Sequence, residues 1–453
     1  MNGFVKKSQA LALCMVASGC LAAFGQAHAD GLFPPDAGPG HSWQQAAPWA
    51  PANPNGTPDY NEDLGPLGKW SVGGGIDFLA STWTNSADGP KSSHYGLTFP
   101  NAIVILNGTK GKFRLRLWAG LPPLTPIVGW TGPGLNPNLH QAGSAENPYG
   151  HASELFKGYI TYSPTDWFDV DVGRIDSVDG TEIGVSWFNP TPMVSPLNNM
   201  QSTTADGIQF DFHHGPGSLS IQLGDGYNTG QISQLGALGQ YSLNDDGSDS
   251  VIVFGHHRLR TAGDLGYAGH VASFGVVNSN LVGLGGMWTI NHKYAISPEV
   301  EYQWLPKGIT GGGITSATAP QTTYSNTAAM IDFTDQVNSY WQSALQVSYV
   351  HQHGNTAQGN TVINGVELNN IYGNYLGLGA PNGAGNLGQG SDMLGVQVGG
   401  TWMYKNLFVR PFLVFTHLTH FEPGNGWGRN GDKSSQVVAL IDIGWLFGDV
   451  KRN

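Results

Sequence analysis

The stretch Gly108-Thr109-Lys110-Gly111-Lys112-Phe113-Arg114-Leu115-Arg116-Leu117 holds the pattern on which the fold depends. After the tight turn, apolar side chains alternate with basic ones. Successive side chains of a β-strand point to opposite faces, so this stretch predicts a strand with one apolar and one cationic face. The turn joins it to the apolar segment Ala102–Leu106, which predicts a β-hairpin.

The same alternation recurs along the chain from about residue 68 onward. It predicts sixteen strands, at or near 72–78, 102–106, 113–117, 156–162, 168–172, 206–213, 219–223, 251–259, 269–277, 281–290, 294–304, 327–334, 338–350, 391–404, 406–418 and 434–447. Residues 251–259 and 269–277 are expected to pair with each other. An even number of strands is typical of bacterial single-chain membrane barrels.

The connections between these strands alternate between short and long. Short turns lie at Gly108–Gly111, Ser163–Asp166, His214–Gly217 and Tyr404–Asn406, and long Gly/Asn/Pro-rich loops at 121–153, 175–205 and 351–391. A transmembrane barrel has this rhythm, because its periplasmic rim carries short turns and its outer rim carries long loops. The prediction is therefore an all-β fold, a closed antiparallel transmembrane β-barrel of about 16 strands. Closure is required because each unpaired backbone group in hydrocarbon costs several kcal/mol.

The N-terminal region predicts export and a leader before the barrel. Residues 1–29 read as a signal peptide, with Lys6 and Lys7 before an apolar run and Ala27-His28-Ala29 as the cleavage site. A lipid-attachment box at Ala17–Cys20 is the alternative. Residues 30–66 form a Pro/Gly-rich leader, either periplasmic or inside the lumen, and residues 67–453 form the barrel.

Composition excludes several classes of protein. Only 11% of residues are charged, against about 25% in soluble domains. Both cysteines, Cys14 and Cys20, leave with the signal, so neither a disulfide framework nor thiol catalysis is expected. Removal of Lys6 and Lys7 leaves 18 basic and 32 acidic residues, a net charge of −14, which argues against a nucleic-acid partner.

One predicted hairpin resembles a hairpin of known proteins. The segment from Phe156-Lys157-Gly158-Tyr159 through Trp167-Phe168-Asp169-Val170-Asp171-Val172-Gly173-Arg174 is similar to a hairpin of the Gram-negative outer-membrane porin superfamily. The chain looks most like the β-barrel porin-2 type, with carbohydrate-selective porins as neighbours. The resemblance implies location in the bacterial outer membrane, contact with its lipid, and passive diffusion of small hydrophilic solutes or ions through a water-filled barrel. The resemblance leaves a homotrimer as one option for the assembly, and the sequence does not decide the oligomeric state.

Charged residues within the predicted strands are expected to face the lumen, because an Arg on the lipid face near the midplane costs about 2–4 kcal/mol. These candidate pore-lining residues are Arg114, Arg116, Asp169, Asp171, Arg174, Glu301, Arg410 and Asp442. The alternative for each is a position near the membrane interface, where the cost is about 0–1 kcal/mol.

The resemblance further implies that the third long loop, 175–205, folds into the lumen and narrows it. Its candidate constriction residues are Asp176, Asp179 and Glu182. Acids opposite lumen arginines would set a transverse field across the opening. The alternative is that these are solvated loop acids.

No catalytic residue, metal site or cofactor is predicted. The chain contains no Gly-x-Ser-x-Gly pattern. His351 and His353 share one face of a predicted strand, but no carboxylate or cysteine follows at a recognisable metal-site spacing. The alternative function is that of an adhesin or scaffold, in which the long loops bind a partner and the lumen is blocked.

Overall fold

The computed structural model of the protein describes residues 62–85, 93–121, 128, 155–182, 184–202, 205–225, 231–244, 249–260, 279–291, 293–305, 324–353, 362–363, 366–367, 392–421, 426–428 and 430–448. The predicted signal peptide and most of the predicted leader lie outside these residues, so their boundaries stay predictions.

The described elements are almost all strands. They are β1 Glu62–Asp63, η1 Gly65–Leu67, β2 Lys69–Thr84, β3 Ser93–Thr98, β4 Ala102–Lys110, β5 Phe113–Leu121, β6 Leu155–Thr165, β7 Phe168–Ile175, η2 Ser186–Phe188, η3 Pro196–Asn199, β8 Ala205–His214, β9 Gly217–Gly224, β10 Gln234–Ser242, β11 Ser250–Arg258, β12 Asn280–Ile290, β13 Tyr294–Leu305, β14 Tyr324–Gln336, β15 Trp341–His353, β16 Val362–Ile363, β17 Val366–Glu367, β18 Asp392–Tyr404, β19 Leu407–His420 and β20 Ser435–Gly448. Within the described residues, no helix is long and apolar enough to cross a membrane.

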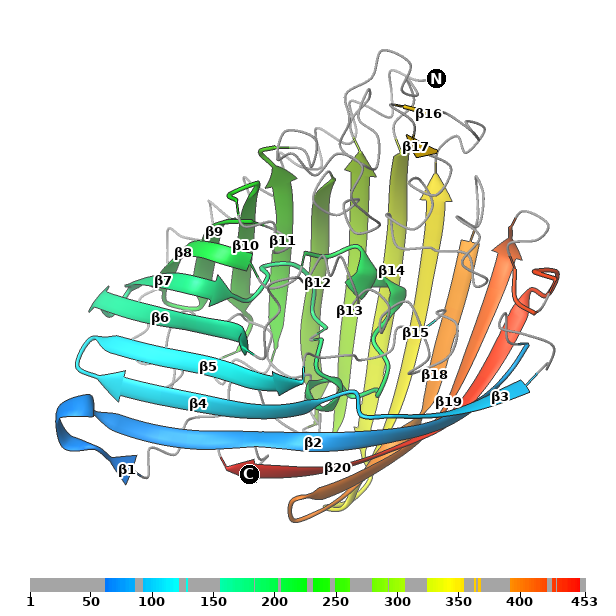
Figure 1. The fold of residues 1–453 in the computed structure, drawn as a ribbon, viewed down its shortest axis with the longest axis horizontal. Coiled ribbons are helices and arrows are strands. Elements are labelled where there is room, and N and C mark those ends of the chain that lie inside the picture. Colours follow the sequence, from blue (N-terminus) through cyan, green and yellow to red (C-terminus); the bar gives the residue numbers. More distant parts are fainter. Residues whose placement is uncertain are drawn as a thin grey trace.

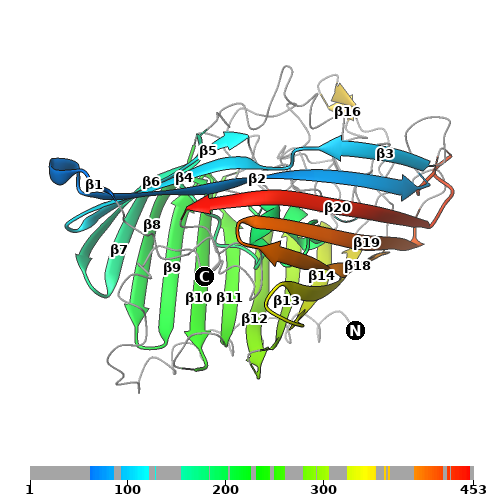
Figure 2. The ribbon, with the colours of Figure 1, turned by 90° about the horizontal axis from the view of Figure 1, so that it is seen from below.

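Sixteen strands form one closed antiparallel barrel, as predicted. Each strand pairs with its neighbours in chain order, and β2 pairs with β20 from Gly73↔Gly448 to Trp83↔Val438, which closes the ring (Figures 1 and 2). The short strands β3 and β4 occupy one position in the ring, because both pair with β2 along its two halves. Pairing of β2 with β20 leaves no free edge where the first and last strands of the ring meet, which a sheet in hydrocarbon requires.

Alternation along the strands separates the two surfaces of the barrel. In β5, Phe113 is 54% exposed on the outside, whereas Arg116 is 7% exposed on the inside. Val437, Ile441 and Trp445 of β20 are likewise exposed, and Asp442 between them is buried. The strands therefore present an apolar outer face, as the division of the sequence predicted.

One predicted strand pair is wrong. The segment 251–259 does form β11, but β11 pairs with β10 and β12, and the predicted partner 269–277 lies outside the described residues. β10 was missed because its sequence, Gln-Leu-Gly-Ala-Leu-Gly-Gln-Tyr-Ser, alternates only weakly in hydrophobicity. Gly236 faces inward and Gly239 faces outward, and neither has a side chain that would show the period-2 alternation of apolar and polar residues.

Candidate functional site

The connection between β7 and β8 crosses the interior of the barrel. Residues 176–202 of this connection, here called the inner loop, hydrogen-bond to His256 of β11 and to Asp77 of β2. β11 is the eighth strand from β2 in either direction around the ring, so these contacts reach opposite walls. The inner loop, with η2 and η3, lies within the ring of strands in both views (Figures 1 and 2).

The local sequence of the inner loop explains its shape. Ser195 caps η3 by accepting a hydrogen bond from Leu197 N at 3.3 Å, and Pro196 occupies the first helical turn, where no N–H is needed. Gly180 has a φ of +73°, and a Cβ there would lie 1.9 Å from the Gln201 amide nitrogen. Only glycine therefore lets the two ends of the loop approach each other.

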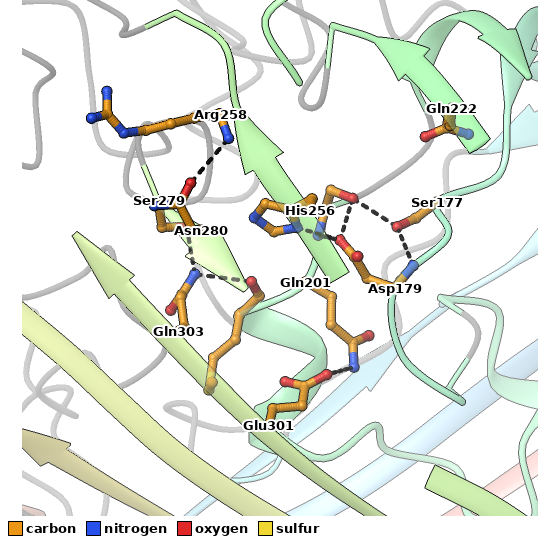
Figure 3. Close-up of polar contacts among 12 residues, drawn as sticks. Ser177, Asp179, Gln201, Gln222, His256, Arg258, Ser279, Asn280, Glu301 and Gln303 are labelled. Atoms are coloured by element: carbon orange, nitrogen blue, oxygen red, sulfur yellow. Dashed lines mark hydrogen bonds and ion pairs between the residues drawn. The ribbon is translucent and has the colours of Figure 1, made fainter. Parts of the chain in front are cut away.

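The first anchor of the inner loop is Asp179. Its Oδ2 lies 2.6 Å from His256 Nδ1 of β11 and accepts hydrogen bonds from Ser202 N at 3.0 Å and Ser202 Oγ at 2.5 Å (Figure 3). Burial alone raises the pKa of Asp179, but His256 and Ser202 outweigh it and hold this pKa below its usual range. Asp179 is thus directed at the wall.

The second anchor is Gln201, at the other end of the inner loop. Its Nε2 donates to Glu299 Oε1 at 2.9 Å and to Glu301 Oε1 at 2.6 Å, both on β13. Next to it, Gln303 of β13 donates to the carbonyl oxygen of Met200 at 2.9 Å (Figure 3). These contacts hold the end of the loop on one strand of the wall.

The third anchor is Glu182. Its carboxylate accepts from Ser195 N at 2.8 Å, from Ser195 Oγ, and from Gln346 Nε2 of β15 at 2.9 Å. The same Gln346 nitrogen donates to Asp332 of β14 at 3.0 Å. Burial and, to a smaller extent, the nearby Asp332 carboxylate raise the pKa of Glu182 to about 8 against the opposing hydrogen bonds from Ser195.

The fourth anchor is the pair Arg410 and Asp442, which face each other across β19 and β20. Arg410 Nε lies 2.8 Å from Asp442 Oδ2, and Arg410 Nη1 donates to the carbonyl oxygens of Ser186 at 3.0 Å and Asn189 at 3.2 Å. Both ionic side chains are fully buried. The pair therefore binds the backbone of η2.

Apolar contacts complete the packing of the inner loop. Its buried apolar residues are Val178, Val185, Trp187, Phe188, Met193, Val194, Leu197 and Met200. Trp187 and Phe188 pack with Ile103, Ile105 and Trp118 of the wall. The inward face of this barrel thus contains apolar surface beside the loop, where the sequence predicted only polar groups.

A separate sector of the wall, on β5 to β8, contains charged residues of both signs. Arg114 Nη2 lies 3.5 Å from Asp169 Oδ2, and Asp171 lies two residues further on the same inward face. Lys157 of β6 pairs with Asp176 at the start of the inner loop, and its Nζ lies 4.1 Å from the centre of the Trp118 ring. The described loop contacts this sector through Phe188, which packs on Trp118, and through Asp176, whose carbonyl oxygen also accepts from Gln222 of the neighbouring β9.

The candidate pore-lining residues fall into two groups. Seven of them, Arg114, Arg116, Asp169, Asp171, Glu301, Arg410 and Asp442, lie on the inward face. Arg174 differs, because the register places it on the outward face with Val170 and Val172, opposite Asp206. It forms a two-point ion pair with Asp206 at 2.8 and 3.1 Å next to the end of β7, where an outward cation costs only about 0–1 kcal/mol.

The candidate constriction residues lie in the inner loop, but they do not face an open passage. Asp179 and Glu182 are 1% and 3% exposed and bind wall and loop groups, while Asp176 pairs with Lys157. Sequence reasoning missed Lys157, His256 and Gln201, because nothing local to them signals a partner in a distant loop. It also missed Val128, whose N–H donates to Val194 O at 2.9 Å and whose side chain is fully buried.

A second polar cluster lies at the ends of β15, β18 and β19. Asp392 accepts from Tyr349 at 2.6 Å and lies 2.9 Å from His420 Nδ1, and His351 also contacts it. His353 stacks edge-on against His351, with ring centres 4.0 Å apart. In the part of the chain that the structure describes, no group of three or more His, Cys, Asp or Glu side chains has an arrangement that would hold a metal.

The closed sixteen-stranded ring and its apolar outer face have the architecture of a transmembrane β-barrel, and the inner loop lies inside it. Similar solved structures are OmpT of Vibrio cholerae, at 11% identity over 85% of this chain and 100% of that chain with a TM-score of 0.49, and the anion-selective porin of Comamonas acidovorans, at 13% over 83% and 99% with 0.48. The outer membrane channel DcaP of Acinetobacter baumannii matches at 10% over 84% and 97% with 0.48. No protein-family model and no curated protein matches the chain.

Proposed function

We propose that the protein is a passive channel for small hydrophilic solutes or ions, and that it catalyses no reaction. The observation that carries the proposal is an inward loop held across the barrel at several wall positions, from His256 to Arg410. A loop fixed in this way narrows the interior without any moving part, which is how a diffusion channel sets a size limit. The signal peptide stays a prediction, and a homotrimer stays one option for the assembly.

The proposal differs from the sequence-based expectation in where selectivity arises. Asp179 and Glu182 are engaged by the wall, so they position the loop instead of facing solute. In the sector on β5 to β8, Arg114, whose side chain is 24% exposed, is the better candidate for a charge that solutes meet, whereas Asp169 and Asp171 are fully buried. Neutralising Arg114 is therefore expected to change the reversal potential more than neutralising Glu182.

The test is ion current across a planar bilayer, followed by liposome swelling with sugars, amino acids and organic acids. A steady current and size-dependent swelling support the channel. A correctly inserted but silent barrel would instead support the adhesin or scaffold function, for which the extensive apolar packing of the inner loop is the favouring observation. Insertion is checked independently by resistance of the barrel to added protease.

A further inference from the structure

Four buried carboxyl groups meet where the inner loop rests on the wall. Glu182 comes from the loop, Glu299 and Glu301 from β13, and Asp332 from β14, and each is at most 5% exposed. We call this group the carboxyl seam. Among the described residues none of the four forms a salt bridge, and the basic side chains that contact the loop, His256, Arg410 and Lys157, lie against other acids.

Two amide groups separate the carboxyls of the seam. Gln201 Nε2 donates to Glu299 at 2.9 Å and to Glu301 at 2.6 Å, and Gln346 Nε2 donates to Glu182 at 2.9 Å and to Asp332 at 3.0 Å. In each case two acids lie within hydrogen-bond distance of one nitrogen. Ionising both carboxyl groups of such a pair in a buried site has a high free-energy cost, because the two negative charges repel each other. Each pair therefore favours retention of a proton.

Water has room to reach one end of the seam. A cavity of about 30 Å³, enough for about two water molecules, is lined by Glu182 and Asp332 together with Thr181, Asn189 and Ser297. This cavity lies between the inner loop and the wall strands, so protons of the seam can exchange with water there. The seam is therefore able to respond to the pH of the solution.

We infer that Glu182, Glu299, Glu301 and Asp332 are positioning residues that hold the inner loop against the wall only while the seam retains its protons. Alkaline solution removes those protons and leaves like charges on both sides of the contact, which pushes the loop from β13 and β14. The pKa of Glu182, raised to about 8 by burial and by Asp332, is consistent with release in mildly alkaline solution.

The other charged groups that contact the loop oppose this release. Asp179, with His256 and Ser202, holds both ends of the loop. Lys157 pairs with Asp176 at its start, and Arg410 with Asp442 holds η2 in its middle. Asp77, which contacts Ser186, adds a further acid on β2. Release is therefore expected between η2 and Ser202, near Thr191.

The experiment measures access to a cysteine in the inner loop of the full chain in lipid vesicles. Thr191→Cys places a small thiol at a fully buried position outside the seam, and Ser339→Cys places a reference thiol in an exposed turn. The rate of labelling by a charged methanethiosulfonate reagent is measured for both from about pH 6 to about pH 10. Dividing the first rate by the second removes the pH dependence of an exposed thiol, and because burial raises the pKa of a thiol, release is judged from the difference between the Thr191→Cys profiles with and without Glu182→Gln.

The expected result is a rise of about tenfold or more in this ratio across the range, since one pKa unit corresponds to a tenfold change in a population. A ratio that stays constant from the acidic to the alkaline end overturns the inference. Any effect on ion current rests on the proposed channel function, whereas the labelling ratio does not. A barrel that conducts no ions but shows a pH-dependent labelling ratio would thus refute the proposed channel function and still support the inference about the carboxyl seam.

Two variants separate the seam from general loosening of the barrel. The Gln side chain in Glu182→Gln stays neutral at every pH. We therefore expect the rise in the labelling ratio to be smaller in this variant and to occur at higher pH. Asp206→Asn removes a carboxyl at the rim, outside the seam, and is expected to leave the profile of the unsubstituted chain unchanged. Equal profiles for Glu182→Gln and the unsubstituted chain, or an equal shift in Asp206→Asn, would contradict the assignment.

Discussion

Arg410 is fully buried and forms an ion pair with the equally buried Asp442, so removing its charge leaves an uncompensated acid inside the barrel. We expect Arg410→Met to lower the free energy of unfolding by about 3–5 kcal/mol. The matched control is Arg174→Met, which breaks the half-exposed rim pair with Asp206 and should cost about 0–1 kcal/mol. Urea unfolding in detergent micelles, followed by tryptophan fluorescence, compares the two. Equal costs would contradict the buried role of Arg410.

Glu182 keeps its proton in the folded protein at pH values where the unfolded chain has lost it, because its pKa is about 8 instead of 4.5. Between these values the folded state binds more protons, so the free energy of unfolding falls as pH rises through this window. Glu182→Gln cannot ionise and is expected to flatten this fall, gaining stability over the unsubstituted chain most clearly above pH 8. Urea midpoints at several pH values provide the measurement, and parallel curves for the two proteins would refute it.

Single residues also show how far the sequence could predict the site. The inward placement of Arg114, Asp169 and Asp171 followed from period-2 alternation. When the apolar neighbours of a charged residue face the lipid, the charged side chain faces the lumen and avoids the energetic cost of contact with hydrocarbon. The contact of Asp179 with His256 joins residues far apart in the chain, and no local pattern specifies it. Arg174 was misplaced because alternation alone does not reveal that a strand end lies near the interface.

Among the elements, strands with strong alternation were predictable and weak ones were not. β5 and β20 have large apolar side chains on every second residue, whereas β10 has Gly236 and Gly239 among small residues. The inner loop has little regular structure of its own, so its path depends on the wall against which it packs. The wall is assembled from strands both before and after the loop, many of them far from it in sequence, and local patterns therefore do not predict its path.

β10 and the inner loop approach most closely at Gly236. A Cβ there would lie 2.5 Å from Val178 of the loop, whereas a Cβ on Gly239 of the same strand would meet nothing within 4 Å. We expect Gly236→Ala to displace the loop and to lower stability by about 1–3 kcal/mol through overpacking. Gly239→Ala should be nearly neutral. The thermal midpoint of the heat-modified band on gel electrophoresis compares the variants, and indistinguishable midpoints would show that the loop is not packed there.

At the scale of the whole molecule, the first and last strands of the barrel depend on each other. β2 and β20 are separated by most of the chain, yet their pairing is as continuous as that of neighbouring hairpins. Because β20 pairs with β2, the ring has no free edge where its first and last strands meet, and their backbone polar groups are not exposed to hydrocarbon there. A barrel surrounded by hydrocarbon therefore requires both an apolar outer face and a closed ring of strands.

This requirement leads to a prediction about the outer surface. Leu413 lies in the middle of β19 and is 54% exposed on the outward face. If that face contacts hydrocarbon, Leu413→Arg should cost about 2–4 kcal/mol, and Tyr340→Arg, in the exposed turn before β15, only about 0–1 kcal/mol. Urea unfolding from lipid vesicles measures both variants against the unsubstituted chain. A Leu413→Arg variant as stable as Tyr340→Arg would mean that this face of the barrel is surrounded by water, and the membrane-spanning assignment would fail with it.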